Sequence, residues 1–255
     1  MIDQTVQRAQ VYYFLSHALL YPQENWFEDF PVITAALRDL DVSIESCSQT
    51  SEVVQTSLPE TSEVSEVLEL SDWSLESLQA AHRQVFGLTG SLMYETELGL
   101  PHEFRQSQEL ADIAGFYRAF GFRTGGTVRE RPDHLATELE FMYLLALKEA
   151  YAASNSMPEQ AEICVDAQRK FLQDHLRRWI GPFCRSLERS IDERLGEAAL
   201  QTPYVMLAHL VESFISLESA RLGVDSAIPP AAEQEPTPYN PDYSCAGCAV
   251  ADSNL

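Results

Sequence analysis

The stretch ERPDHLATELEFM, residues 130–142, combines a helix start with the densest polar cluster of the chain. Pro132 suits the first position of a helix, where its missing N–H removes no hydrogen bond. Leu135, Leu139 and Met142 recur at spacings of four and three residues, which places them on one helix face. The stretch therefore predicts a helix that begins at Pro132 and packs its leucine face inward.

The same periodicity recurs on both sides of this stretch, and no segment shows the convincing alternation that indicates a strand. The predicted helices comprise an N-terminal one ending near Tyr21 and Pro22, and others over residues 26–40, 75–86, 110–120, 158–176, 183–195 and 203–222. Glycines are expected to close four of them, at Gly87, Gly121, Gly196 and Gly223. On the helix over 158–176, the predicted inward face holds Ile163, Ala167, Phe171 and Leu176. The sequence thus predicts an all-α fold, a single helical bundle of about eight or more helices.

The composition excludes several classes of protein. The chain has 255 residues, 45% of them hydrophobic, which is enough apolar material for a core. The 39 acidic and 17 basic side chains give a formal charge of −22, which repels nucleic acid and anionic lipid. We therefore expect a basic partner, no nucleic acid and no stable membrane association. Because no secretory leader opens the sequence and the five cysteines are an odd number, we expect a cytoplasmic protein.

Two segments differ in composition from the rest. Residues 43–71 are rich in Ser, Thr and Glu and offer little apolar surface to offset the cost of ordering. Residues 224–255 contain five prolines, which favours an extended tail. The predicted organisation is one helical domain over residues 1–223, with an acidic, mobile insertion at 43–71, followed by a flexible tail.

The polar cluster itself has two interpretations. In a structural one, Asp133 caps the helix and His134 bonds a neighbouring loop. In a functional one, His134 and Glu138, which are four residues apart and share a helix face, belong to a recognition surface. Spacing alone leaves both open.

Residues 130–142 resemble the hallmark segment of the TorD/DmsD/NarJ family of redox-enzyme maturation chaperones. Further segments agree with that family in order: YETE at residues 94–97, ELADIAGFY at 109–117, and FLQDHL at 171–176 with Trp179 and Pro182 after it. The resemblance covers residues 5–220 approximately. The acidic insertion and the tail depart from the common pattern, so no family role is assigned to them.

The resemblance implies a helical chaperone without catalytic activity. Such a protein binds the immature catalytic subunit of a molybdenum oxidoreductase, its twin-arginine leader, or both, and assists folding, cofactor insertion and export proofreading. The molybdopterin guanine dinucleotide belongs to the client, so we expect no cofactor in this chain. We also expect no GTP binding, because no glycine loop that would cradle phosphates is present. The identity of the molybdoenzyme and the choice between monomer and homodimer stay open.

The resemblance also assigns candidate residues for client binding. The family's Pro-Asp-His patch falls on Pro132, Asp133 and His134, and its Tyr-Glu motif falls on Tyr94 and Glu95. These five positions are the expected centre of the site.

The chemistry of a twin-arginine leader adds further candidates. Two guanidiniums followed by an apolar stretch require carboxylates and an apolar groove. The candidate carboxylates are Asp133, Glu95 and Glu97. The candidate groove walls are Tyr94, Phe104, Phe116 and Tyr117, for which ordinary core packing is the alternative.

Two other functions compete with the chaperone. An all-α metal-dependent hydrolase or oxidase would use His134, Glu138 and Glu140, but the chain has no Glu-x-x-His pair. The C-x2-C pair of Cys245 and Cys248 lacks a second pair to complete a four-ligand zinc site. We therefore expect neither an enzyme nor a metal site. The sequence does not separate a chaperone from a stable accessory subunit of the mature complex, because both expose similar recognition surfaces.

Overall fold

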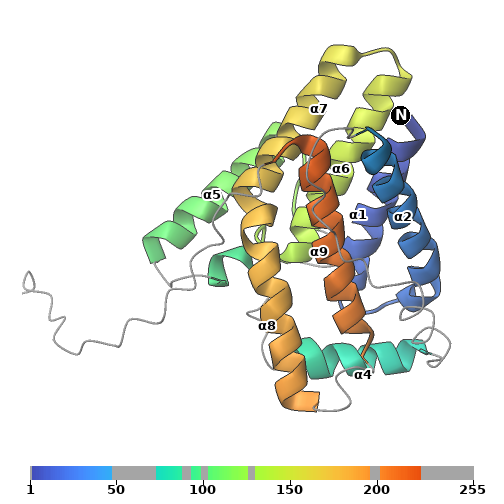
Figure 1. The fold of residues 1–255 in the computed structure, drawn as a ribbon. Coiled ribbons are helices and arrows are strands. Elements are labelled where there is room, and N and C mark those ends of the chain that lie inside the picture. The colour runs from blue at the N-terminus through green and yellow to red at the C-terminus, as the bar shows by residue number, and fades with distance from the viewer. Residues whose placement is uncertain are drawn as a thin grey trace, which may run out of the picture.

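The structure, a computed structural model, describes residues 2–47, 73–87, 93–98, 103–125, 130–195 and 202–224. Within these ranges every regular element is a helix, which confirms the predicted all-α fold (Figure 1). The long helices are α1 (Ile2–Ala18), α2 (Phe30–Cys47), α4 (Leu75–Phe86), α5 (Glu103–Ala119), α6 (Leu135–Ser154), α7 (Pro158–Phe171), α8 (Arg177–Leu195) and α9 (Pro203–Leu222).

Helix α6 is the central element of the bundle. It packs along α1 and forms a hairpin with α7, while α8 and α9 pair with each other and α4 contacts both (Figure 1). Because α6 is apolar on most of its circumference, it buries side chains toward several neighbours, Leu139, Phe141 and Leu145 among them. Among the described helices, none combines the length and the apolar character that a membrane crossing requires.

Several predicted helix boundaries are confirmed. Pro158 occupies the first turn of α7, and Thr202 with Pro203 begins α9. Gly223 follows α9 with φ of 64°, a left-handed conformation that glycine adopts without strain. The local rules for helix ends therefore work where no tertiary contact competes.

Other boundaries differ from the prediction. Helix α6 begins at Leu135 rather than at Pro132, because His134 is its N-cap. Gly87 is the C-cap of α4 as predicted, although its conformation is right-handed, with φ of −66°. Helix α2 continues to Cys47 and so includes the first residues of the predicted insertion. The rest of that insertion, Gly196, and the tail with its C-x2-C pair lie outside the described residues.

The chain passes from α7 to α8 through a π turn, Leu172–Leu176. The sequence predicted two helices, one ending at Leu176 and the next running from Phe183, whereas α8 starts at Arg177 and contains Pro182. A π turn holds one more residue than an α turn and so redirects the side chains that follow it. One of the redirected side chains is His175, which is buried at 3% exposure.

A buried ionic network ties four helices together. Arg8 on α1 donates two parallel bonds to Glu218 on α9, Nε to Oε1 at 2.7 Å and Nη2 to Oε2 at 2.8 Å. It also donates to Glu149 on α6 at 3.2 Å and to Gln168 on α7. Because Arg8 is 3% exposed and Glu218 fully buried, each charge depends on its ion-pair partners for compensation, and Arg8 is the main partner of Glu218.

Candidate functional site

Two segments that are distant in the sequence meet at the N-terminal end of α6. Tyr94 and His134 form an antiparallel bridge, and the Glu95 amide donates to the Asp133 carbonyl at 2.9 Å. The hydroxyl of Tyr117, on α5, donates to the carbonyl of Pro132 at 2.7 Å. We call this arrangement of residues 93–98 against residues 130–134 the latch.

The Asp133 carboxylate is completely buried inside the latch. Its Oδ2 accepts from the Thr96 hydroxyl at 2.7 Å and from Arg131 Nη2 at 2.8 Å, and its Oδ1 accepts from Arg131 Nε at 3.0 Å. These charge-assisted bonds satisfy the carboxylate within its own chain. The expectation that Asp133 pairs directly with a client guanidinium is therefore corrected, because the side chain faces the interior.

His134 is the N-cap of α6 through its ring. The Nδ1 atom accepts from the Ala136 amide at 3.1 Å, so the neutral ring carries its proton on Nε2. Burial lowers the pKa of His134 to about 4, although Glu130 and Asp133 act in the opposite direction. The structural interpretation of the sequence predicted that Asp133 caps the helix and His134 bonds a neighbouring loop. The structure shows the reverse, because His134 caps the helix and Asp133 bonds the neighbouring segment. At 5% exposure, His134 does not form an open recognition surface either.

Acid should weaken the latch through His134. The unfolded chain binds more protons than the folded one between the ordinary pKa of 6.5 and the folded value of about 4, so stability falls as pH falls through this window. Between about pH 7 and about pH 5, we expect wild type to lose about 1 to 2 kcal/mol more unfolding free energy than His134→Asn, which keeps a capping side chain without the titration. Urea unfolding at both pH values measures the difference. Equal losses in the two proteins would contradict this role of His134.

A second buried polar group lies behind the latch. Glu95 is only 9% exposed, and its Oε2 lies 3.0 Å from Nδ1 of His175 in the π turn. On the other side of that ring, Nε2 of His175 lies 3.4 Å from Asp112 of α5. Glu138 accepts from Trp179 Nε1 at 3.2 Å, and burial, followed by repulsion from Glu95, raises its pKa well above the ordinary value. Glu95 is therefore corrected from a surface carboxylate to an interior one.

The remaining sequence candidates are divided between the surface and the core. Glu97 is exposed and pairs with Arg131 at 2.5 Å. Tyr117 packs in the core against Phe141, as the alternative interpretation held. The half-buried candidates are Pro132, Tyr94 and Phe116, the last of which packs against Phe171 and His175. The side chain of Phe104 lies outside the described residues.

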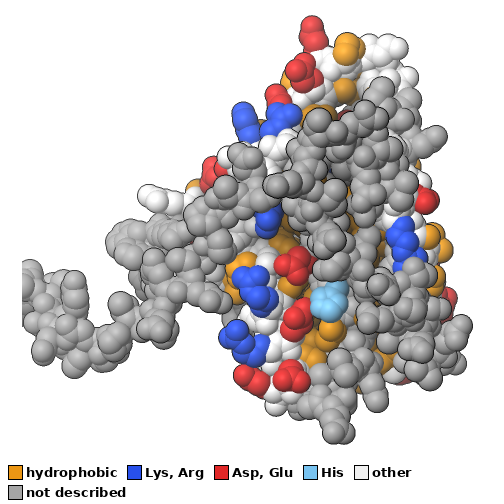
Figure 2. All heavy atoms as spheres, in the orientation of Figure 1, with side chains coloured by type: hydrophobic (Ala, Val, Ile, Leu, Met, Phe, Trp, Pro, Cys, Tyr) orange, Lys and Arg blue, Asp and Glu red, His pale blue; other side chains and the backbone are white. Residues whose placement is uncertain are grey.

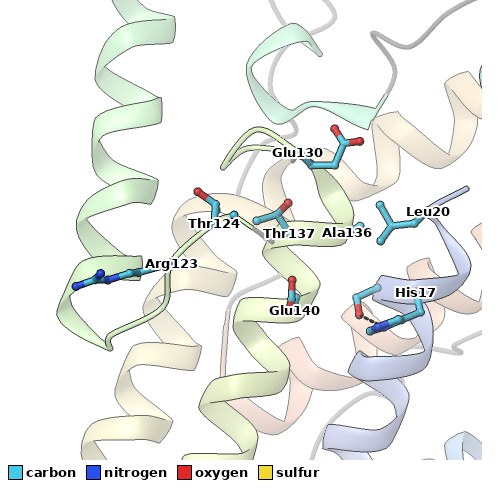
Figure 3. Close-up of a pocket in the computed structure, with 10 residues that line it drawn as sticks. His17, Leu20, Arg123, Thr124, Glu130, Ala136, Thr137 and Glu140 are labelled. Carbon is cyan, nitrogen blue, oxygen red and sulfur yellow. Dashed lines mark hydrogen bonds between the residues drawn. The ribbon is translucent and has the colours of Figure 1, made fainter. Parts of the chain in front are cut away.

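A polar cavity of about 250 Å³ lies beside the latch, between the end of α1 and the first turns of α6 (Figure 3). Glu130 and Glu140 line it, and the Tyr94 hydroxyl donates to Glu130 at 3.0 Å, which joins the cavity wall to the latch. Arg123 also lines the cavity, but Figure 3 shows its side chain extended away from the other labelled groups. No ion pair involves Glu140 among the described residues. The cavity therefore presents the carboxylates of Glu130 and Glu140 to a ligand, with the imidazole of His17 on the α1 side.

Sequence reasoning missed some of these groups. Arg131 stands directly before Pro132 and two residues before Asp133, and this proximity was the available signal for their ion pair. No local signal marks Thr96 or His175, because their partners lie 37 and 80 residues away. In the part of the chain that the structure describes, no three His, Cys, Asp or Glu side chains gather as a metal site would require.

Comparison with known proteins gives matches to several assembly chaperones. The chlorate reductase assembly chaperone protein of Ideonella dechloratans is 30% identical over 152 residues, covering 58% of this chain and 72% of that protein. The selenate reductase assembly chaperone protein of Thauera selenatis is 32% identical over 114 residues, or 45% and 53% of the two chains. The perchlorate reductase assembly chaperone protein of Dechloromonas aromatica (strain RCB) is 36% identical over 106 residues, which cover 42% of this chain and 43% of that protein.

The profile of one protein family matches more than half of the chain. That family is described as "Nitrate reductase delta subunit", and the match covers residues 54–185, which include both segments of the latch, the π turn and α6. Together with the reductase assembly chaperones, this match confirms the resemblance drawn from residues 130–142. The chain belongs to the nitrate reductase delta subunit family, the NarJ- and TorD-like family of maturation chaperones.

Proposed function

We propose that this chain is a cytoplasmic assembly chaperone for the catalytic subunit of a molybdenum oxidoreductase, which is its client. It binds the immature client and its twin-arginine leader before the molybdopterin guanine dinucleotide is inserted and the client is exported. Family membership and the three relatives named as reductase assembly chaperones support this proposal. In this role the chain binds a polypeptide, catalyses no reaction and uses no cofactor of its own.

The acidic cavity beside the latch is the observation that carries leader binding. A guanidinium is a planar group that pairs with carboxylates, and Glu130 and Glu140 line the same cavity. The formal charge of −22 adds a long-range attraction for a basic segment. Cavity and charge together fit an arginine side chain of the leader.

This assignment gives the Pro-Asp-His triplet, in which Asp133 and His134 are buried, a positioning role. Asp133 fixes residues 93–98 against the turn, and His134 caps the helix from which Glu140 projects. Tyr94, held in the bridge to His134, donates to Glu130 at the cavity wall. The triplet therefore shapes the cavity without contacting the leader.

Glu140→Gln should weaken binding of a synthetic twin-arginine leader peptide. The substitution removes a charged acceptor from the cavity while leaving the exposed side chain nearly unchanged in size. A hydrogen-bonded charge pair contributes about 1.5 to 3 kcal/mol, so we expect the dissociation constant to rise roughly tenfold or more. Isothermal titration calorimetry measures the change.

Asp192→Asn is the matched control, since it removes the same charge from an exposed position on α8. It should leave affinity within about twofold of wild type, because isolated surface charges act weakly. A peptide with both arginines replaced by glutamine should bind wild type and the Glu140→Gln variant with equal affinity. Equal weakening by Glu140→Gln and Asp192→Asn would reduce the effect to net charge and remove the cavity from the proposal.

Co-purification separates a chaperone from a stable accessory subunit. In a cell that makes both proteins, the chaperone proposed here should be recovered with client that still carries its leader and lacks its cofactor. Recovery with the finished, cofactor-loaded enzyme instead would favour the accessory subunit.

A further inference from the structure

One face of α6 connects the acidic cavity with a second surface feature. Glu140, Leu144, Leu147 and Tyr151 follow one another at spacings of four, three and four residues, which places them along a single side of the helix. Glu140 lines the acidic cavity, and Leu147 and Tyr151 line an apolar groove farther along. With a rise of 1.5 Å per residue, the two ends of this face are about 16 Å apart.

The groove lies where the α6–α7 hairpin meets the end of α5. Its volume is about 460 Å³. Its apolar lining comes from three regions: Phe120 directly after α5, Leu147 and Tyr151 of α6, and Met157, Ile163 and Cys164 at the N-cap and in the first half of α7. Volume and lining suit two or three large apolar side chains of a bound polypeptide.

The hydrophobic side chains around the groove are unusually exposed. Tyr151 is 66% exposed and Ile163 is 56% exposed, although the sequence pattern had placed Ile163 on the inward face of α7. Of the eight large hydrophobic side chains that are exposed in the described residues, four line this groove: Leu147, Tyr151, Met157 and Ile163. Such clustering marks an interaction surface, whereas single exposed apolar residues do not. Figure 2 shows hydrophobic and acidic side chains together at the end of the molecule where α6 and α7 meet.

We propose that this groove binds the apolar stretch that follows the arginine pair of the leader, while the arginines occupy the acidic cavity. The inference rests on the proposed function and extends it to a second contact on the same face of α6. A span of about 16 Å corresponds to about five residues of extended chain. The leader would therefore lie along α6, with its charged part near Glu140 and its apolar part near Tyr151.

Charge favours the leader over a second copy of this chain as the occupant. Two molecules that each carry a formal charge of −22 repel one another, whereas a basic leader is attracted. Near the groove, exposed Glu159 and Glu162 of α7 outnumber the single basic residue in its lining, Lys148. An apolar segment next to basic residues complements both properties of this surface.

The test compares a double substitution in the groove with a matched control. Leu147→Ser with Tyr151→Ser removes two exposed apolar side chains, so folding should be preserved, as circular dichroism and thermal unfolding would show. We expect leader affinity to fall roughly tenfold or more, because apolar anchors dominate binding of this kind. Val32→Ser on α2, which removes a side chain that is 67% exposed, should leave affinity unchanged.

A second peptide, which keeps the arginine pair but replaces the apolar stretch with serine and glycine, locates the effect. This peptide should bind wild type and the groove variant with equal affinity, and its affinity should still fall with Glu140→Gln.

If the groove variant binds the complete leader as tightly as wild type while Glu140→Gln does not, this inference is wrong and the proposed function stands. If wild type binds neither peptide, both are wrong. If the substitutions instead convert a dimer to a monomer in sedimentation without changing leader affinity, the groove is an interface between copies and the inference is overturned.

Discussion

Replacing Arg8 with methionine is expected to lower the free energy of unfolding by about 3 to 5 kcal/mol, because removing one partner of a buried ion pair leaves the other uncompensated. Methionine retains the apolar stem but not the guanidinium that bonds Glu218, Glu149 and Gln168. Arg221, which contacts Glu218 at 3.0 Å, would remain beside the buried carboxylate. Urea unfolding at neutral pH measures the loss.

The exposed pair of Glu188 and His209, 2.8 Å apart, provides the control. Glu188→Gln should cost less than about 1 kcal/mol, as surface ion pairs do. Adding Glu218→Gln to Arg8→Met should recover part of the loss, since no buried charge is then left without its partner. A cost for Arg8→Met that matches the surface control would show that the network contributes little to stability.

The same network predicts how stability responds to acid. Burial alone would raise the pKa of Glu218, but Arg8 and then Arg221 outweigh it and lower the value to about 2. Because the ordinary pKa is 4.5, this contribution is complete above that value and is lost as pH falls toward about 2. Arg8→Met should therefore lose less stability than wild type across that interval.

Replacing Asp133 with alanine should detach residues 93–98 from the turn that precedes α6. The change removes an acceptor of charge-assisted bonds and leaves the Thr96 hydroxyl without its 2.7 Å partner, so we expect a cost of about 2 to 3 kcal/mol. Exchange of the Glu95 amide hydrogen, which donates to the Asp133 carbonyl, should accelerate more than exchange within α9. Leader affinity should fall as well, because Glu130 loses its support through Tyr94.

Glu97→Gln separates the buried contact from the exposed one. It disrupts the pair with Arg131, whose side chains are 28% and 37% exposed, and should cost less than about 1 kcal/mol. Asp133→Ala with unchanged stability but weaker leader binding would contradict the positioning role and restore Asp133 as a direct contact.

The helices of this protein could be predicted from the sequence because their determinants are local. Pro158, Pro203 and Gly223 mark ends by backbone geometry, and apolar periodicity identifies the inward face of α6. The π turn at Leu172–Leu176 was missed, since it keeps the helical pattern nearly intact and is fixed by tertiary contacts of residues such as His175. Ile163 was misplaced because periodicity identifies a face of a helix and does not show whether a neighbour covers it.

The orientation of the side chains at the candidate site could not be predicted from the sequence. Asp133 and Glu95 look like surface carboxylates until Thr96, Arg131 and His175 are brought to them. The contacts of Thr96 and His175 join residues that are far apart in the chain. The contact of Arg131 depends on a turn before Leu135, which the sequence pattern had assigned to the helix. From the sequence, Glu140 was only a candidate metal ligand. The cavity beside it is formed in part by the end of α1, which is distant in the sequence, so no local pattern indicates it.

The latch also bears on the order in which the protein folds. Its two segments are separated by α5, so the contact between Thr96 and Asp133 closes a loop of 37 residues, and we expect it to form late in folding. Until the latch closes, Glu130 lacks its hydrogen bond from Tyr94 beside the acidic cavity. Under the proposed function, competence to bind a client would then arise late in the chaperone's own folding.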